Sequence, residues 1–320
     1  MRPLGVIPSV ARDLLLLFTL VMLGHTEAAA QRFSAPPGYE LAWSDEFDRD
    51  GWPDPRNWTY ERGFVRNNEH QWYQADNAIV NNGQLVIEAR RESKPNPTFQ
   101  QGSTDWRRSR ERVEYTSSSL STRGLHSFRY GRFEMRARID VRPGMWPAFW
   151  TLGDVGRWPA NGEIDIMEYY RDSLLANVAW GSAVADKAVW DDSRKALTAL
   201  GDASWSTKFH VWRMDWDESE IRLYVDDVLL NTTDLHTTIN ADGSGKNPLQ
   251  QPHYIILNLA IGGNNGGDPS ATKLPARFEI DYVRVYQRSR TSSGVVPTGA
   301  PSATERPALS GHPRASVTSH

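Results

Sequence analysis

Apolar and charged side chains alternate along residues 132–139, and no other feature restricts the possible folds of this chain as strongly. The apolar members of the run are Phe133, Met135, Ala137 and Ile139. A repeat of two places every second side chain on the same face of a β-strand, whereas a helix repeats every three to four residues. The segment therefore predicts a strand with one buried and one exposed face.

Further β-rich runs follow one another along the chain, and turn signals separate them. They are residues 85–87, 221–225, 228–230, 253–261 and 278–286. Asn82-Gly83 precedes the first run, and Asp226-Asp227 joins the second to the third, which predicts a hairpin. No run of helix length carries a clear apolar stripe. Many short strands with turn-rich connections predict an all-β fold, a sandwich or β-jelly roll.

The 320 residues divide into one domain and two terminal segments of different composition. Residues 1–30 contain an apolar run, Leu14 to Leu23, and end in three alanines, which predicts a signal peptide and secretion to the periplasm or outside the cell. An uncleaved anchor is the alternative. Residues 31–37 predict a polar linker and residues 38–287 a single domain. Residues 288–320 are rich in Ser, Thr, Pro, Gly and Ala, which predicts a disordered tail.

Charge and composition narrow the classes of function. The net charge is −3, so no basic field is available to attract nucleic acid. The chain has no cysteine, so the exported domain must be stable without disulfides. It has 13 tryptophans and 11 tyrosines, a content typical of all-β cores and of sites where flat rings stack on sugars.

The segment Asn161–Tyr169 places three acidic residues between large apolar ones. In a regular strand, Glu163 and Asp165 share a face, whereas Glu168 points to the buried face, where a lone carboxylate is unfavourable. A β-bulge at Ile166-Met167 would return Glu168 to the acidic face. The two glutamate Cα atoms would then lie roughly 13 Å apart. Side chains that lean together bring the carboxyl groups to the about 5–5.5 Å separation of a retaining glycosidase.

Three acidic groups this close together cannot all ionise freely, so at least one pKa must rise. A raised pKa is what a general acid needs near neutral pH. A solvated acidic face and a cation site are the alternatives for this segment.

These residues resemble family 16 of the glycoside hydrolases, the laminarinase and lichenase group. Glu163 to Glu168 reads E-I-D-I-M-E and matches the signature of the bulged subgroup at every position. Other segments that resemble the family are Trp43–Phe47, Tyr130–Glu134, Gly144–Trp150 and Asp281–Tyr286.

The resemblance implies a β-jelly roll whose curved sheet forms an open substrate cleft. It implies that Glu163 is the nucleophile, that Glu168 is the acid/base and that Asp165 tunes and orients them. Trp146 and Trp158 are predicted to be exposed stacking platforms. The complete set of predicted substrate-binding residues is Trp146, Trp150, Trp158, Asn67, Glu69 and Tyr169.

Catalysis is expected to need no cofactor, but the family often binds a structural calcium ion far from the cleft. Its ligands are backbone oxygens near the chain start and at the glycine of a turn, together with an aspartate of the last strand, and the matching positions are Glu46, Gly83 and Asp281. Oxygen-only ligands suit a hard cation. We therefore expect calcium, if bound, to stabilise the fold without taking part in the chemistry.

The best substrate prediction is a β-1,3- or mixed β-1,3/1,4-glucan, cleaved internally with retention. The alternatives are an agarase- or porphyranase-like galactan hydrolase, a transglycosylase, and a jelly roll that binds glycan without cleaving it. Four arginines in residues 105–112 either read an anionic galactan or form a self-neutralised surface loop. We expect a monomer whose partner is a polysaccharide, with no nucleic acid and, after signal cleavage, no membrane.

Overall fold

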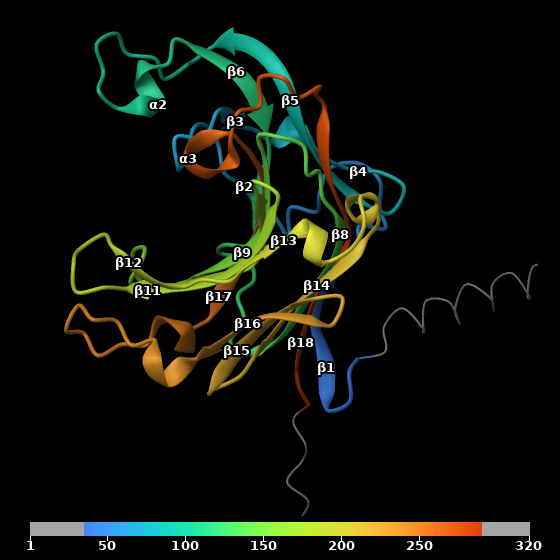
Figure 1. Ribbon diagram of the computed structural model, residues 1–320, viewed down its shortest axis with the longest axis vertical. Helices are drawn as coiled ribbons and strands as arrows, with labels where there is room; N and C mark the ends of the chain where they lie inside the picture. The colour runs from blue at the N-terminus through green and yellow to red at the C-terminus, as the bar shows by residue number, and fades with distance from the viewer. Residues whose placement is uncertain (1–34, 290–320) are drawn as a thin grey trace, which may run out of the picture. The chain divides into compact units, whose positions relative to one another are not determined.

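A computed structural model describes residues 35–289 of the chain (Figure 1). The predicted signal peptide, most of the linker and nearly all of the predicted tail lie outside the described residues. The last strand ends at Arg288, one residue beyond the predicted end of the domain.

The larger of two sheets has ten strands. They are β1 (Tyr39–Asp45), β3 (Gln71–Tyr73), β4 (Ala78–Val80), β5 (Leu85–Pro95), β6 (Arg112–Ser117), β8 (Gly131–Arg138), β14 (His210–Trp216), β15 (Glu220–Val225), β16 (Val228–Asp234) and β18 (Ala276–Arg288). The order is β16-β15-β14-β8-β18-β5-β6-β3, and β1 and β4 pair with β18 and β5. All pairs are antiparallel except β3 with β6.

The smaller sheet has eight strands. They are β2 (Thr59–Tyr60), β7 (Ser119–Ser121), β9 (Met145–Gly153), β10 (Glu163–Tyr170), β11 (Ser173–Gly181), β12 (Ala188–Asp191), β13 (Arg194–Ala196) and β17 (His253–Ile261). The order is β12-β11-β10-β9-β17-β7-β2, with β13 beside β11. In Figure 1, β9, β11 and β12 follow an arc, so this sheet is curved.

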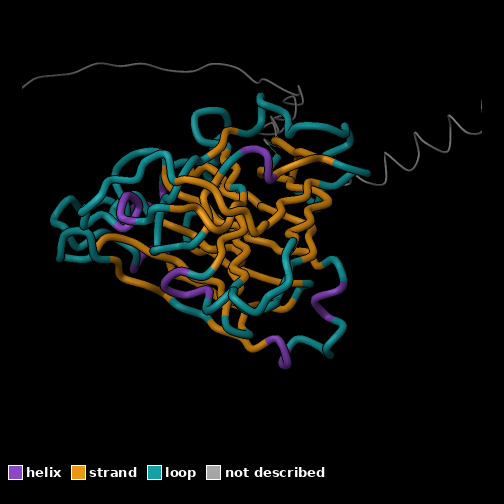
Figure 2. Tube along the Cα trace, turned by 90° about the horizontal axis from the view of Figure 1, so that it is seen from above, coloured by secondary structure: helices purple, strands orange, loops and turns teal. Residues whose placement is uncertain are grey.

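Helical structure in the described residues is short and peripheral, as Figure 2 shows. The helices are α2 (Trp106–Ser109), α3 (Gly263–Gly266) and the 3-10 turns Ala75–Asn77, Leu197–Ala199, Trp205–Thr207, Leu235–Thr237 and Pro248–Gln250. None of the helices within residues 35–289 is long and apolar enough to cross a membrane.

The period-two pattern predicted the strands well. The alternating run forms β8, whose residues are buried and half-buried in turn. The predicted hairpin is β15–β16, and Asp226 and Asp227 take φ angles of 45° and 65° in its turn. Two successive positive φ angles give the tight turn whose twist matches the strands on either side.

The core lies between the two sheets. Phe133 and Met135 of β8 pack in one apolar cluster with Phe149 of β9 and Leu257 of β17, and all four side chains are fully buried. The face of β9 and β10 that does not enter this cluster is free to carry polar groups.

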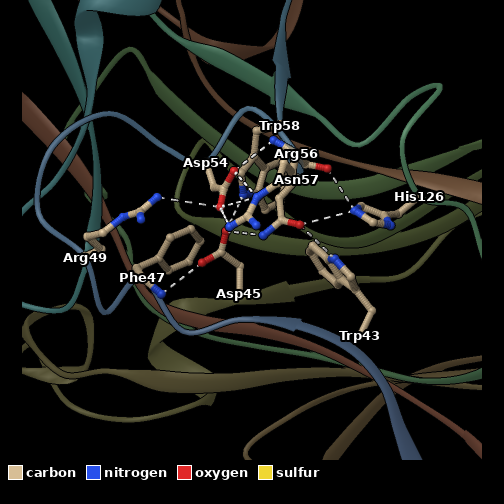
Figure 3. Close-up of polar contacts among 9 residues, drawn as sticks. All are labelled: Trp43, Asp45, Phe47, Arg49, Asp54, Arg56, Asn57, Trp58 and His126. Carbon is tan, nitrogen blue, oxygen red and sulfur yellow. Dashed lines mark hydrogen bonds and ion pairs between the residues drawn. The ribbon is translucent and has the colours of Figure 1, made fainter.

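A polar network anchors the end of β1 to the segment before β2 (Figure 3). The Asp45 carboxylate accepts hydrogen bonds from the backbone N–H of Phe47 (3.0 Å), Asn57 Nδ2 (2.9 Å) and Trp58 Nε1 (2.8 Å). Trp58 is 2% exposed, so its indole N–H has no access to water if Asp45 is removed. The network therefore ties the end of β1 to the residues that lead into β2.

We predict that Asp45→Ala lowers the free energy of unfolding by about 2 kcal/mol, because it leaves a buried indole N–H unpaired. The melting temperature should fall by roughly 4–8 °C. Arg49→Ala is the matched control, since Arg49 is 83% exposed and only approaches Asp54, at 3.9 Å. Equal melting temperatures for the two variants would contradict this role of Asp45.

Candidate active site

The acidic strand β10 contains the predicted bulge. Along β9, Asp165 pairs with Trp150 and Met167 with Phe149, so Ile166 has no partner. Along β11, the register also shifts between Asp165 and Glu168. One extra residue in β10 therefore lies between the second and third acidic residues, as the spacing predicted.

The bulge determines which side chains of β10 face the core and which face the opposite side of the sheet. Ile166 and Met167 are adjacent in sequence, yet both are fully buried in the core cluster. Glu163 and Glu168 line a cleft on the opposite face. Without the extra residue, strict alternation would place these glutamates on different faces.

The cleft has a volume of about 610 Å³ and combines aromatic rings with amide and carboxylate groups. Its lining residues are Val65, Arg66, Asn67, Trp146, Trp150, Leu152, Trp158, Glu163, Glu168, Tyr170, Asn177, Trp190, Asp192 and Asn265. Flat rings with a few polar groups that fix orientation are typical of a sugar-binding cleft.

Asp165 lies beneath the cleft, 1% exposed, beside Glu163. Burial raises its pKa well above the usual range, and the charges of Glu163 and Glu168 raise it further. Burial also raises the pKa of Glu163, and hydrogen bonds from Asp165 and Trp158 oppose this rise. The protonated form of Asp165 donates a hydrogen bond to Glu163, which favours the ionised form of Glu163.

Glu168 has a different environment. Trp146 Nε1 donates a hydrogen bond to its Oε1 at 2.8 Å. Burial raises the pKa of Glu168 to about 7, with smaller contributions from the charges of Glu163 and Glu69. One carboxyl group whose hydrogen bonds favour its ionised form and one whose pKa lies near 7 form the pair needed for nucleophilic and general-acid roles.

The three predicted tryptophans all line the cleft, but in different ways. Trp158 is 42% exposed and donates its Nε1–H to Glu163, so an open face remains for stacking. Trp146 is only 5% exposed, and the prediction of an exposed platform is wrong for it, because its ring packs edge-on against Tyr170. Trp150 is fixed by a 2.7 Å hydrogen bond to Asn258.

Tyr169 is not a cleft residue, which corrects its predicted contact with sugar. It is 2% exposed in the core, and its hydroxyl donates to the carbonyl of Val141 at 2.8 Å. Tyr170 lines the cleft instead. Once the bulge has returned Glu168 to the cleft face, strand alternation sends the next side chain inward.

Asn67 lines the cleft, but Glu69 does not. Glu69 is 2% exposed and accepts hydrogen bonds from Gln71 Nε2 (2.6 Å) and Asn67 Nδ2 (3.3 Å). Its predicted sugar contact is wrong because these bonds hold its carboxylate below the surface, where it supports Asn67. Arg66, which the sequence did not single out, forms an ion pair with Glu61 and lies 4.9 Å from the centre of the Trp150 ring.

Of the residues predicted to bind calcium, Asp281 is the one that would use its side chain, and its carboxylate lies 2.7 Å from a guanidinium nitrogen of Arg136. The Glu46 carboxylate accepts two hydrogen bonds from Arg284, which do not involve its backbone oxygen. Gly83 occupies a turn with φ of 72°. A guanidinium beside Asp281 competes with a cation for the same oxygens. Within the described part of the chain, no three acidic or histidine side chains cluster closely enough to hold a metal ion.

The chain is similar in sequence to proteins of a known family. Residues 66–284 match the profile of glycosyl hydrolases family 16. The chain belongs to this family. It is 38% identical over 285 residues to a beta-glucanase of Rhodothermus marinus, an alignment that covers 83% of the chain and 92% of that protein.

Solved structures agree with this assignment. The hydrolase resembles the laminarinase from Rhodothermus marinus with 38% identity and a TM-score of 0.64, over 79% of this chain and 99% of that one. It also resembles a structure described with endo-acting O-glycanases of the human gut microbiota, with 34% identity and a TM-score of 0.73, over 80% and 93% of the two chains. The predicted jelly roll and glycosidase class are confirmed, and hydrolysis in this family needs no cofactor.

Proposed function

We propose that the enzyme hydrolyses internal linkages of a β-1,3- or mixed β-1,3/1,4-glucan with retention at the anomeric carbon. The observation that carries the proposal is the pair Glu163 and Glu168, which face one cleft from one strand and have different hydrogen-bond partners. The matching relatives named as glucanases support the glucan, and the name laminarinase of a solved relative agrees with it.

The mechanism follows from the protonation states. The Glu163 carboxylate attacks the anomeric carbon while protonated Glu168 gives its proton to the departing glycosidic oxygen, which forms a covalent glycosyl-enzyme. Glu168, now ionised, takes a proton from water, and this water displaces Glu163. Asp165 orients Glu163 and supplies a hydrogen bond that stabilises its carboxylate before the first step and as it departs in the second.

The charge of the cleft favours a neutral glycan over a sulfated galactan. Among the described lining residues, Arg66 is the only cation, and it is already paired with Glu61 and packed on Trp150. A sulfate ester would therefore meet the carboxylates of Glu163, Glu168 and Asp192 without a free positive charge.

The proposal is tested by incubating the full chain with laminarin, lichenan, agarose, porphyran and mucin O-glycans, then measuring new reducing ends. Laminarin or lichenan should give the fastest release, and proton NMR should show the β-anomer first. An initial α-anomer would contradict the double displacement. Products longer than the starting oligosaccharides would identify a transglycosylase.

An O-glycanase is the second candidate. The observation in its favour is the TM-score of 0.73 to the structure described with mucin O-glycanases, against 0.64 for the laminarinase. Release from mucin O-glycans without release from laminarin would select this alternative. Binding of glycans without any release would identify a non-catalytic binding protein.

We predict that kcat/KM falls as the pH rises through about 7. Glu168 must carry its proton to act as a general acid, and burial raises its pKa to about 7, so the active form is lost above that pH. A pH profile of the wild type should show this alkaline limb. Glu168→Ala, assayed on an aryl glycoside whose leaving group needs no proton, should lack it. A limb that persists in this variant would show that another group is responsible.

We also propose that the enzyme is secreted. The support is the apolar run and alanine-rich site within residues 1–30, which lie outside the described residues. Cell fractionation with mass analysis of the mature N-terminus tests this proposal. An intact N-terminus in the membrane fraction would instead indicate an uncleaved anchor.

A further inference from the structure

The arginine-rich segment lies on the connection between β5 and β6, where Figure 1 shows α2. We define residues 105–110 as the arginine segment and residues 65–70 as the cleft loop. Arg107 Nη2 donates to the carbonyl of Val65 at 2.7 Å. Arg110 donates through Nη2 to the carbonyl of Asn68 at 2.8 Å and through Nη1 to that of Glu69. Two guanidinium groups therefore bind three carbonyl groups of a loop that lines the cleft.

Stacked rings fix these guanidinium groups. Arg107 and Arg110 lie 4.7 and 4.8 Å from the centre of the Trp106 ring, and Arg110 lies 4.8 Å from that of Phe64. Phe64 directly precedes the cleft loop and is 6% exposed. The rings of Trp106 and Phe64 thus hold the two guanidinium groups in place. This favours a fixed geometry over a mobile surface charge.

The cleft loop needs outside support because its backbone is unusual. Asn67 and Asn68 have φ angles of 55° and 52°, both in the left-handed region. Asparagine tolerates this region better than most residues, but two in a row persist only when neighbouring groups fix them. The bond between Asn67 Nδ2 and Glu69 is long, at 3.3 Å, and supplies little of that support.

A glycine turn closes the loop from the other side. The backbone N–H of Asn264 donates to the carbonyl of Asn67 at 2.8 Å. A Cβ on Gly263 would lie 2.7 Å from this carbonyl oxygen and 2.9 Å from the Cα of Glu69. The loop is therefore confined between the arginine segment and residues 262–266.

We propose that Arg107 and Arg110 are positioning residues that hold the cleft loop in the conformation in which Arg66 and Asn67 face the glycan. This proposal rests on the proposed function for its kinetic part only. It replaces both earlier interpretations of the segment. The two guanidinium groups donate to the protein backbone, which leaves them unsuited to bind sulfate. For the same reason the segment is not simply a self-neutralised surface loop.

The test compares Arg110→Ala with the matched control Arg108→Ala in the full chain. Arg108 belongs to the same arginine segment, its side chain is 52% exposed, and this side chain contacts only Asp105 and Gln100. Hydrogen–deuterium exchange of peptides that cover residues 65–70 should become about tenfold faster in Arg110→Ala and remain unchanged in Arg108→Ala. Arg107→Ala, which loses one backbone bond, should show a smaller change and serves if Arg110→Ala does not fold.

Kinetics on the best glycan provide the second readout. KM should rise about tenfold in Arg110→Ala, while kcat changes by less than about threefold, because no hydrogen bond or ion pair of the described residues joins Glu163 or Glu168 to the loop. Gly263→Ala, which disturbs the loop from the opposite side, should raise KM in the same way. Exchange and KM equal to those of Arg108→Ala would overturn the proposal, as would a loss of kcat at constant KM. If the wild type cleaves none of the glycans, the proposed function fails and the exchange result alone decides the proposal.

Discussion

Replacing Glu163 by alanine is expected to reduce kcat by at least about 10⁴-fold on every substrate, including aryl glycosides with good leaving groups. The reason is that Glu163 is the proposed nucleophile, and hydrogen bonds from Asp165 and Trp158 favour its ionised form. No other group in this position can attack the anomeric carbon. Added azide should restore activity and give an α-glycosyl azide, because azide enters from the face that Glu163 leaves.

Glu168→Ala should behave differently. Loss of the general acid should reduce hydrolysis of glucans by about 10²–10⁴-fold, while aryl glycosides should still form the glycosyl-enzyme. Azide should then give a β-glycosyl azide, because it attacks the intermediate from the side of the missing acid/base. Identical responses of the two variants to aryl glycosides and azide would contradict the assigned roles. Melting curves of both variants serve as the control for folding.

Deletions in the bulge should have the second-largest effect. Removing Ile166 alone gives Glu-Ile-Asp-Met-Glu, in which all three acidic residues keep even spacing on a regular strand. The core then loses one large side chain, for a loss of stability of about 2–5 kcal/mol. Measurable activity should survive below the melting temperature, because both glutamates still face the cleft.

Removing Ile166 and Met167 together gives Glu-Ile-Asp-Glu, with the last glutamate at odd spacing. That carboxylate would enter the apolar core, which costs about 3–5 kcal/mol beyond the loss of packing. The variant should be inactive and unfold at a lower temperature than the single deletion. Equal activity of the two deletion variants would show that spacing parity does not control this site.

The sequence predicted most of the strand system and the catalytic pair because both depend on local periodicity. In a regular strand Glu168 would point to the face opposite the other two acidic residues, and this mismatch predicted the bulge. The same parity would have placed Tyr169 in the core and Tyr170 in the cleft, so this error did not come from missing information.

Other parts of the site depend on contacts between segments far apart in the chain. Asn177 faces Asp165 only because β11 pairs with β10 in one register. Trp190 reaches the cleft from β12, an edge strand with no acidic motif. The ion pairs of Asp281 and Glu46 likewise join distant segments, and no local pattern announces them. Such contacts follow from tertiary packing, which periodicity in one segment does not encode.

The position of β10 within its sheet has a further consequence. Hydrogen bonds to β9 and β11 secure both of its edges, so the backbone that carries the carboxyl pair is held on both sides. Asn67 and Trp190, by contrast, come from a loop and an edge strand at the rim of the cleft. The residues that cleave the bond thus lie on a central strand, whereas residues that contact the glycan lie on a loop and an edge strand. The rim of this scaffold can diverge or be grafted to accept new glycans while the chemistry beneath it stays intact.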